Sequence, residues 1–476
     1  MVFSSPIFLF LYLPLTLALH FILPQRLRNF FLLLASLFFY SWGEVASCWV
    51  VVVSVVLNYS FAAWIDVSPQ KNKVLALGVF ANLLLLGWFK YAAFIAENMN
   101  RVLEQFGASL ALSSPAIHLP LGVSFFTFHS ISYLIDVKRG NASVQKSFID
   151  FALYILLFPQ LIAGPIIRYK DIAHQLRARI TSRHDFALGF YRFVIGLGKK
   201  MLIANPLGET ADKIFTVAAT DLTGPVAWLG ILTYTFQIYF DFSGYSDMAI
   251  GLMRMLGFRI LENFNYPYLS RSVREFWRRW HISLSTWFRD YVYIPLGGNR
   301  QSVWRSYVNL VIIFVLCGFW HGASWSFLVW GLWHGIFLAL ERTSFGVMIE
   351  RCSRPVQHVY LILVVMIGWA FFRADTLSQS FLYLRAMAGL TGANPLLYPL
   401  PMYLDLYTSV AIMLAVVGSV PVWRGFGARY RVGGEASTFA AVGWSAMQSV
   451  SMVLILALSV CFVAAGTYNP FIYFRF

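Results

Sequence analysis

The sequence predicts an all-helical protein that crosses a membrane many times. Of its 476 residues, 59% are hydrophobic and only 12% are charged, whereas a soluble globular domain carries about 25% charged residues. Mean hydropathy is +0.67. Apolar stretches long enough to cross a hydrocarbon core of roughly 30 Å recur along the chain. Length alone would allow about two or three soluble domains, but no long Ser, Pro or Gly linker divides the chain, and the hydropathy argues against them.

About 11–13 membrane segments are expected, and those shorter than about 18 residues could be half-helices or re-entrant segments. The candidates are residues 7–23, 29–43, 45–65, 74–95, 119–136, 149–167, 186–204, 225–253, 307–320, 324–341, 357–373, 404–421 and 447–466. One membrane domain, 1–476, is predicted. Its parts are peripheral helices in 1–110, a core rich in polar and helix-breaking residues in 119–341, and C-terminal helices with an aromatic tail in 357–476.

The formal net charge of +15 would also suit a nucleic-acid-binding protein. In a membrane protein, basic cytoplasmic loops explain it better, and no nucleic-acid partner is expected. The first apolar segment lacks the basic start and the cleavage site of a signal peptide. Arg26 and Arg28 follow it, so the N-terminus is expected outside the cytoplasm. Four scattered cysteines without CxxC spacing suggest neither a disulfide framework nor a metal site.

Six arginines lie among aromatic residues between Arg271 and Arg300. Left at the lipid midplane they would cost roughly 15–20 kcal/mol on insertion scales, so they must face a polar cavity, a funnel or the membrane surface. If residues 270–290 form one helix, one face carries Trp277, Trp280, Leu284 and Trp287. Another face then carries Arg274, Arg278, His281, Ser285 and Arg289. Such a helix could lie on anionic headgroups or form a phosphate-binding wall.

Two Trp-His-Gly strings follow, centred on His321 and His334. A histidine at membrane depth is a functional hypothesis, because a neutral imidazole can accept a proton from a hydroxyl and return it to a leaving group. A hydrogen-bonded core histidine is the alternative. Spacing alone does not say which of the two would be catalytic.

Other candidates have structural readings at least as good. His129 and Asp136 share a helix face and are expected to anchor helices rather than line a cavity. Asp241 and Asp247 are expected to pair with arginines, although Asp241 could also orient a histidine. Residues 158–165 contain two prolines and a glycine, which suit either a kinked helix or a break beside a cavity. The tail Thr467–Phe476 could be an aromatic membrane anchor, or it could offer the Tyr473 hydroxyl to a reaction.

Several long strings together resemble the membrane-bound O-acyltransferase (MBOAT) family, most closely its bacterial alginate O-acetylation (AlgI-like) branch. The resemblance covers nearly the whole chain, and the strings jointly are highly specific. They are Met1–Ser5, Leu161–Pro165, Tyr239–Gly251, Glu275–Trp287 and Trp320–Gly322.

This resemblance implies a ring of helices around a funnel that nearly pierces the membrane. His321 matches the intramembrane family histidine at its narrow point, and His281 matches a second one. In this branch, acetyl groups from cytoplasmic acetyl-CoA cross the inner membrane for O-acetylation of an exported polysaccharide. The last transfer is made by a periplasmic partner with a serine-hydrolase-like domain, which acts with a polysaccharide synthase and export complex. This chain is expected to end earlier than its alginate relatives, which leaves alginate, cellulose or another exopolysaccharide open.

The resulting expectation is an inner-membrane acetyltransferase that holds no permanent cofactor and uses acetyl-CoA as donor. The CoA phosphates would be held by some of Arg271, Arg274, Arg278 and Arg279. His321 would act as general base, and His281 would orient or polarise. The acceptor could be a partner's serine, the sugar, or Tyr473 as an acyl relay, with the N-terminus and the tail in the periplasm. A transporter or scaffold for an acyl donor or glycan is the competing class, and D-alanyl transfer to teichoic acid is a less close match within the family.

Overall fold

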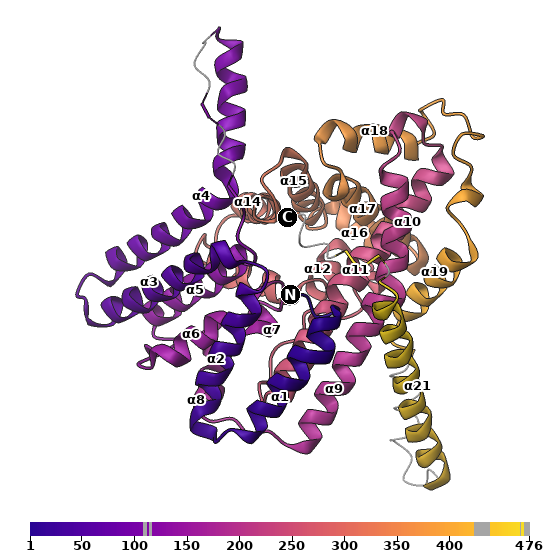
Figure 1. The fold of residues 1–476 in the computed structure, drawn as a ribbon. Coiled ribbons are helices and arrows are strands. Elements are labelled where there is room, and N and C mark those ends of the chain that lie inside the picture. The colour runs from indigo at the N-terminus through magenta and orange to yellow at the C-terminus, as the bar shows by residue number, and fades with distance from the viewer. Residues whose placement is uncertain (108–111, 114–116, 423–437, 467, 471–476) are drawn as a thin grey trace.

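The structure is a computed structural model, and it describes residues 1–107, 112–113, 117–422, 438–466 and 468–470, with only the backbone at 438–442 and 444. Within these ranges every regular element is a helix and no strand occurs, so the predicted fold class is confirmed. Figure 1 shows the helices grouped around the N-terminus, which lies near the middle of the molecule. The helices are α1 (Leu13–Ile22), α2 (Gln25–Ser41), α3 (Cys48–Val67), α4 (Lys71–Gln105), α5 (Val123–Arg139), α6 (Phe148–Leu156), α7 (Phe158–Leu161), α8 (Tyr169–Arg177), α9 (Arg183–Gly198), α10 (Asn205–Phe215), α11 (Gly224–Met255), α12 (Val273–Arg279), α13 (Ile282–Phe288), α14 (Val303–His321), α15 (Trp325–Leu340), α16 (Ser344–Arg351), α17 (Arg354–Arg373), α18 (Leu377–Met387), α19 (Leu406–Gly418) and α21 (Thr438–Ala464).

Short turns of other helix types connect or extend these helices. The π-helical turns are η1 (Phe8–Tyr12), η3 (Lys199–Ala204) and η6 (Arg289–Tyr293). The 3-10 turns are η2 (Val45–Ser47), η4 (Ala219–Asp221), η5 (Pro267–Leu269) and η7 (Leu400–Met402). The π turns η1 and η3 lead directly into α1 and α10, so the backbone stays helical across each junction.

The long apolar helices confirm a protein that crosses the membrane several times. Among the described residues, five helical stretches are long and apolar enough to span a bilayer: Val45–Val67, Lys71–Gln105, Val303–His321, Arg354–Arg373 and Ser445–Ala464. Shorter apolar helices in the same part of the chain cover Phe8–Ile22, Trp325–Leu340 and Leu406–Gly418. The expected count of about 11–13 segments is not reached by this measure, because several predicted spans are shorter than a full crossing or are broken in the middle.

Helix α11, 32 residues long, is the central element. It packs against α9, α10 and η3, and its other contacts include α17, α18 and α19. A Cβ at Gly196 of α9 would lie 2.5 Å from the carbonyl oxygen of Gly244 in α11, so only small residues allow this approach. Asp247 of α11 pairs with Arg192 at 2.6 Å and with Lys199 at 2.7 Å. Close backbone contact and ion pairs therefore hold α9 and α11 together.

The segment with two prolines and a glycine is a broken helix, not a kinked one. Helix α6 ends at Leu156, the four-residue α7 follows, and the chain continues without helix to α8. The N–H groups freed by this break find side-chain acceptors. Phe158 donates to Ser36 Oγ at 3.1 Å, and Ile167 donates to His129 Nε2 at 3.3 Å. Non-helical backbone at membrane depth survives here because protein atoms satisfy it.

The prediction of one helix over 270–290 is wrong. Helix α12 ends at Arg279 and α13 begins at Ile282, with Trp280 and His281 between them. His281 has φ of +44°, in the left-handed region that non-glycine residues rarely adopt. The Oδ1 atom of Asn263 accepts hydrogen bonds from the Ser283 N–H at 3.2 Å and from its hydroxyl at 2.9 Å. These bonds hold the turn, and they turn His281 away from the arginine face.

Candidate functional site

A pocket of about 680 Å³ opens beside His321. We call it the histidine pocket. Its walls come from the N-terminus, the segment before α3, helix α4, the start of α5 and the end of α14, and its lining includes Met1, Glu44, Lys90, Gly122, Trp320 and His321. Residues from the predicted peripheral part of the chain thus contribute directly to this cavity.

His321 is the last residue of α14 and is buried among aromatic rings. Its ring centroid lies 4.8 Å from Trp320, 5.2 Å from Trp330 and 5.1 Å from Phe372. The Trp330 ring stands perpendicular to the imidazole. Three aromatic rings thus surround the imidazole, and His321 also lines the histidine pocket.

His281 is also buried, and its hydrogen bonds define its tautomer. Its Nδ1 lies 3.1 Å from Asn263 Oδ1. Because an amide oxygen can only accept, the neutral imidazole carries its hydrogen on Nδ1 and its lone pair on Nε2. Asn263 is fixed in turn, since its Nδ2 donates to Ser246 Oγ at 3.0 Å. Within the described part of the chain, His281 Nε2 has no hydrogen-bond partner.

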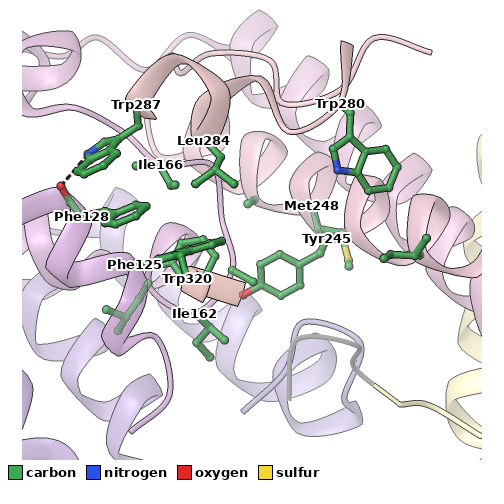
Figure 2. Close-up of a cluster of buried hydrophobic side chains, with 14 of the residues drawn as sticks. Phe125, Phe128, Ile162, Ile166, Tyr245, Met248, Trp280, Leu284, Trp287 and Trp320 are labelled. Atoms are coloured by element: carbon green, nitrogen blue, oxygen red, sulfur yellow. Dashed lines mark hydrogen bonds between the residues drawn. The ribbon is translucent and has the colours of Figure 1, made fainter. Parts of the chain in front are cut away.

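The Trp320 ring links the two histidines. It lies 4.8 Å from His321 and 6.4 Å from His281. On its other side it stacks on Phe128 at 5.1 Å, and Phe128 stacks on Trp287 at 3.8 Å. Figure 2 shows this cluster, including the hydrogen bond of 3.1 Å from Trp287 Nε1 to the Phe128 carbonyl.

The predicted apolar face of the arginine-rich segment is confirmed by burial, although it is divided between two helices. Trp277 lies in α12, Trp280 in the break, and Leu284 and Trp287 in α13. All four side chains are buried. Figure 2 shows Trp280, Leu284 and Trp287 within one hydrophobic cluster.

A second cavity, of about 260 Å³, lies on the arginine side of α12 and α13. We call it the arginine pocket. Its described lining residues include four arginines and an apolar floor but no acidic residue. The arginines are Arg274, Arg278, Arg289 and Arg342, and the floor includes Leu310, Phe314, Cys317 and Leu338. Arg289 pairs with Asp290 at 2.7 Å. Arg278 has neither an ion-pair nor a hydrogen-bond partner among the residues that the structure describes. Such a surface suits a phosphate-bearing ligand with an apolar arm.

The other two predicted arginines have different surroundings. Arg271 and Arg274 line a neighbouring cavity of about 280 Å³ that also contains the carboxylates of Glu275, Glu341 and Glu350. Glu341 accepts the backbone N–H groups of Val273 and Arg274. Arg279 pairs with Glu275 at 2.8 Å and donates to the Asn265 carbonyl at 3.1 Å. Arg278 therefore lines the arginine pocket only, Arg274 lines both cavities, and Arg271 and Arg279 are held near carboxylates.

Two tryptophans separate the pockets. Trp277 lines the arginine pocket, and its ring lies 5.8 Å from Trp330, which contacts His321 at 5.2 Å. Cys317 lines the arginine pocket and His321 lines the histidine pocket. These residues are one turn of α14 apart, roughly 6 Å along the helix axis. A group that passes from one pocket to the other therefore needs to cross only a thin partition.

The structure separates His321 from the second Trp-His-Gly histidine. His334 is fully buried, and Trp277, Trp330 and Trp369 surround its ring. It does not line the histidine pocket or the arginine pocket. Tyr473, the predicted acyl relay, lies outside the described residues.

The anchoring role expected of His129 and Asp136 is confirmed. His129 accepts the Ile167 N–H, and Asp136 accepts the Tyr291 hydroxyl at 2.6 Å. Asp247 pairs with an arginine, as predicted. Asp241 pairs with Lys200 at 2.7 Å, and its expected pairing with an arginine stays a prediction.

Sequence reasoning missed three residues of this region: Lys90, Asn263 and Arg342. Lys90 had a signal, since a lone lysine inside an apolar span is a functional candidate. Asn263 lies in a non-helical stretch with no motif, and Arg342 follows α15 in an ordinary helix end. Their roles depend on tertiary contacts that spacing does not encode.

Comparisons with known proteins agree with this architecture. The model of the MBOAT, membrane-bound O-acyltransferase family, matches residues 34–378, more than half of the chain. A probable alginate O-acetylase AlgI of Azotobacter vinelandii is 40% identical over 502 aligned residues, and the alignment covers 100% of both chains. The corresponding protein of Pseudomonas aeruginosa is 46% identical over 391 residues, 81% of this chain and 75% of that one. A peptidoglycan O-acetyltransferase of Helicobacter pylori is 34% identical over 520 residues, 100% of this chain and 98% of the relative.

The full-length alignment with the Azotobacter protein reaches both ends of both chains, so the earlier end expected of this chain is not seen against that relative. The family match covers α14 and the segment that carries His281. The chain therefore belongs to the membrane-bound O-acyltransferase family, in its AlgI-like branch, and is a multi-pass membrane acyltransferase.

Proposed function

We propose that this protein transfers acetyl groups from cytoplasmic acetyl-CoA across the inner membrane for O-acetylation of an exported polysaccharide. The observation that carries the proposal is the pair of pockets on either side of the partition formed by Trp277 and Trp330, one rich in arginine and one lined by His321 next to the N-terminus. The names of the relatives support it, since two are described as probable alginate O-acetylases and one as a peptidoglycan O-acetyltransferase.

The arginine pocket is the proposed donor site. Coenzyme A carries a pyrophosphate and a 3′-phosphate, and guanidinium groups bind phosphate oxygens in paired hydrogen bonds. Arg278, without a protein partner in the described part of the chain, and Arg274 are the primary candidates, joined by Arg289 and Arg342. The apolar floor that ends at Cys317 would accept the pantetheine arm and bring the thioester toward the tryptophan partition.

His321 is the proposed general base. The acceptor hydroxyl attacks the thioester carbonyl, a C–O bond forms, and the C–S bond breaks. The proton moves from the hydroxyl to the imidazole and then to the departing sulfur of coenzyme A, so the step is balanced. His281 would orient rather than polarise, because the tautomer set by Asn263 offers Nε2 as an acceptor and leaves no N–H on that side.

The orientation follows from the positions of basic residues relative to the two pockets. Helix α5 begins beside the histidine pocket and ends in Lys138 and Arg139. Arg139 donates to the Asp290 carbonyl beside Arg289, on the arginine-pocket side. By the positive-inside rule this side is cytoplasmic, so the histidine pocket and the N-terminus would face the periplasm.

The acceptor enters from the periplasm. It is a serine of a periplasmic serine-hydrolase-like partner, the sugar itself, or Tyr473 as an acyl relay in the tail. Mass spectrometry of the protein after incubation with acetyl-CoA separates these, because only a relay leaves an acetyl group on Tyr473. A polysaccharide synthase and export complex would supply the polymer, which could be alginate, cellulose or another exopolysaccharide.

The test is release of free CoA from acetyl-CoA by purified protein, with wild type, His321→Ala and His334→Ala compared. Loss of a general base lowers the rate by about 10²–10⁴-fold, so His321→Ala is expected to fall by that factor. His334→Ala is expected to keep a CoA-release rate close to that of wild type if it folds, because His334 lines neither pocket. Movement of intact acetyl-CoA or glycan without thioester cleavage would instead identify a transporter.

A further inference from the structure

Lys90 of α4 lies in the wall of the histidine pocket, and also in that of a smaller adjoining cavity of about 280 Å³. Its ammonium group donates to the carbonyl oxygens of Trp320 at 2.6 Å and His321 at 3.0 Å. It also lies 3.4 Å from Ser124 Oγ and 5.8 Å from the centroid of the Trp320 ring. A single cation thus touches the backbone of His321 and the ring that links the two histidines.

The neighbouring residue completes this contact. Tyr91 donates from its hydroxyl to the Phe319 carbonyl at 2.9 Å, and its ring stacks on Phe319 at 4.1 Å. The last carbonyls of a helix have no partner within the helix. In α14 the three consecutive carbonyls of residues 319–321 are satisfied by two consecutive residues of α4, while Gly318 O accepts the Gly322 N–H. Helix α4 therefore caps the helix that carries His321.

The charge of Lys90 has an unusual environment. No carboxylate among the described residues forms an ion pair with it. A cation at a helix C-terminus is stabilised by the partial negative charge of the unpaired carbonyls, and this accounts for a lysine inside an apolar span. Glutamine or methionine would fill much of the same space without the charge, so the space alone does not explain a lysine at this position.

We propose that Lys90 is a positioning residue for the acyl transfer. It holds the backbone of Trp320 and His321 so that the imidazole keeps its place in the wall of the histidine pocket, and it fixes the Trp320 ring between the histidines. This inference rests on the proposed function, since it takes His321 as the reacting group. Small displacements of a reacting group cost large factors in rate, so the effect is expected in kcat.

The test compares Lys90→Met, Lys90→Arg and Tyr91→Phe in the CoA-release assay. Lys90→Met is expected to lower kcat by about 10–100-fold while KM for acetyl-CoA stays within about twofold, because Lys90 lines no part of the arginine pocket. Lys90→Arg is expected to recover part of kcat, since it keeps a cation that can donate to both carbonyls. Tyr91→Phe is expected to lose less, because its carbonyl is two residues from His321. Lys73→Met, at an exposed position near the start of the same helix, is the control.

Three results would overturn the inference. The first is a kcat of Lys90→Met within about twofold of that of wild type. The second is a kcat of Lys90→Arg no higher than that of Lys90→Met. The third is an equal loss of kcat in Lys90→Met and Tyr91→Phe, which would indicate that α4 merely anchors α14. Thermal unfolding of each variant identifies any that fail to fold, and Lys90→Arg then carries the decision. If His321→Ala itself retains full CoA release, the proposed function fails. If His321→Ala is inactive and Lys90→Met is normal, only the positioning role fails.

Discussion

At the scale of single residues, Arg278 and Arg279 are adjacent in sequence but lie in different surroundings. Arg278 lines the arginine pocket, and no acidic residue is found among the described residues that line it. Arg279 is taken up by Glu275 at 2.8 Å and by the Asn265 carbonyl. A guanidinium that is paired with a carboxylate must give up that partner before it binds phosphate. Of these two arginines, Arg278 is therefore the one that is ready to bind an anionic donor. The pair therefore offers an internal control.

Arg278→Ala is expected to raise KM for acetyl-CoA by about 10–100-fold, since a charge-assisted hydrogen bond contributes about 1.5–3 kcal/mol, with kcat little changed. Arg279→Ala is expected to change KM by less than about twofold, because its ion pair is partly exposed and such pairs contribute about 0–1 kcal/mol. Steady-state CoA release measures both. Equal increases in KM for the two variants would contradict the assignment of the donor site to the arginine pocket.

The histidines illustrate what residue patterns can and cannot predict. The five strings taken together were specific enough to predict the family, and the choice of His321 over His334 rests on that resemblance and stays a prediction. The burial of Trp277 and Trp287 followed from helical spacing. The position of His281 was not predictable in this way. Its left-handed backbone depends on Asn263, 18 residues earlier in the chain, and nothing in the local pattern marks that contact. A helix read through 270–290 therefore put His281 on the wrong face.

At the scale of elements, the sequence predicts well where the apolar stretches lie, but it predicts poorly which helices contact one another. The apolar stretch of α4 was predicted as a span, but its capping of α14 through Lys90 and Tyr91 depends on how the two helices meet. The same holds for α9 and α11. Glycines at 196 and 244 allow their backbones to touch, and the ion pairs around Asp185 and Asp247 form only once the helices are packed.

The junction of α9 and α11 yields a prediction on pH. Asp185 lies in the first turn of α9, and hydrogen bonds from Ser182 and Arg259, then from Arg254, lower its pKa to about 2. A carboxyl group with a folded-state pKa below its unfolded value of about 3.9 stabilises the fold above that value and loses this contribution as the pH falls toward 2. Asp185→Asn is therefore expected to lower the unfolding temperature in detergent at pH 7, and the difference from wild type is expected to shrink between pH 5 and about pH 3.

The matched control for this measurement is Asp66→Asn. Asp66 is exposed near the end of α3 and forms no ion pair within the described ranges, so its replacement is expected to leave the unfolding temperature nearly unchanged at every pH. A loss for Asp185→Asn that is the same at pH 7 and pH 3 would mean that its ionisation does not stabilise the α9–α11 junction.

At the scale of the whole molecule, the two pockets follow one another along α14. The histidine pocket is at its C-terminal end, where the N-terminus, α4 and α5 meet. The arginine pocket lies along the middle of α14, where Leu310, Phe314 and Cys317 line it. An all-helical membrane fold was predictable from composition, but the closeness of these two cavities was not, because it joins residues near the N-terminus with residues more than 200 positions later.

This arrangement predicts the sidedness of the pockets. In a variant whose native cysteines are replaced, a cysteine at His118, which is 71% exposed at the rim of the histidine pocket, is expected to react with a membrane-impermeant maleimide in intact spheroplasts. A cysteine at Arg289, which is 59% exposed in the arginine pocket, is expected to react only after the membrane is opened. The reason is that basic residues gather on the Arg289 side, where Arg139 contacts Asp290, and such residues mark the cytoplasmic face.

The reverse pattern would mean that the arginine pocket faces the periplasm and could not bind a cytoplasmic donor. Labelling at both positions without lysis would mean that Arg289 is reachable through the protein, and a continuous channel would then replace the tryptophan partition.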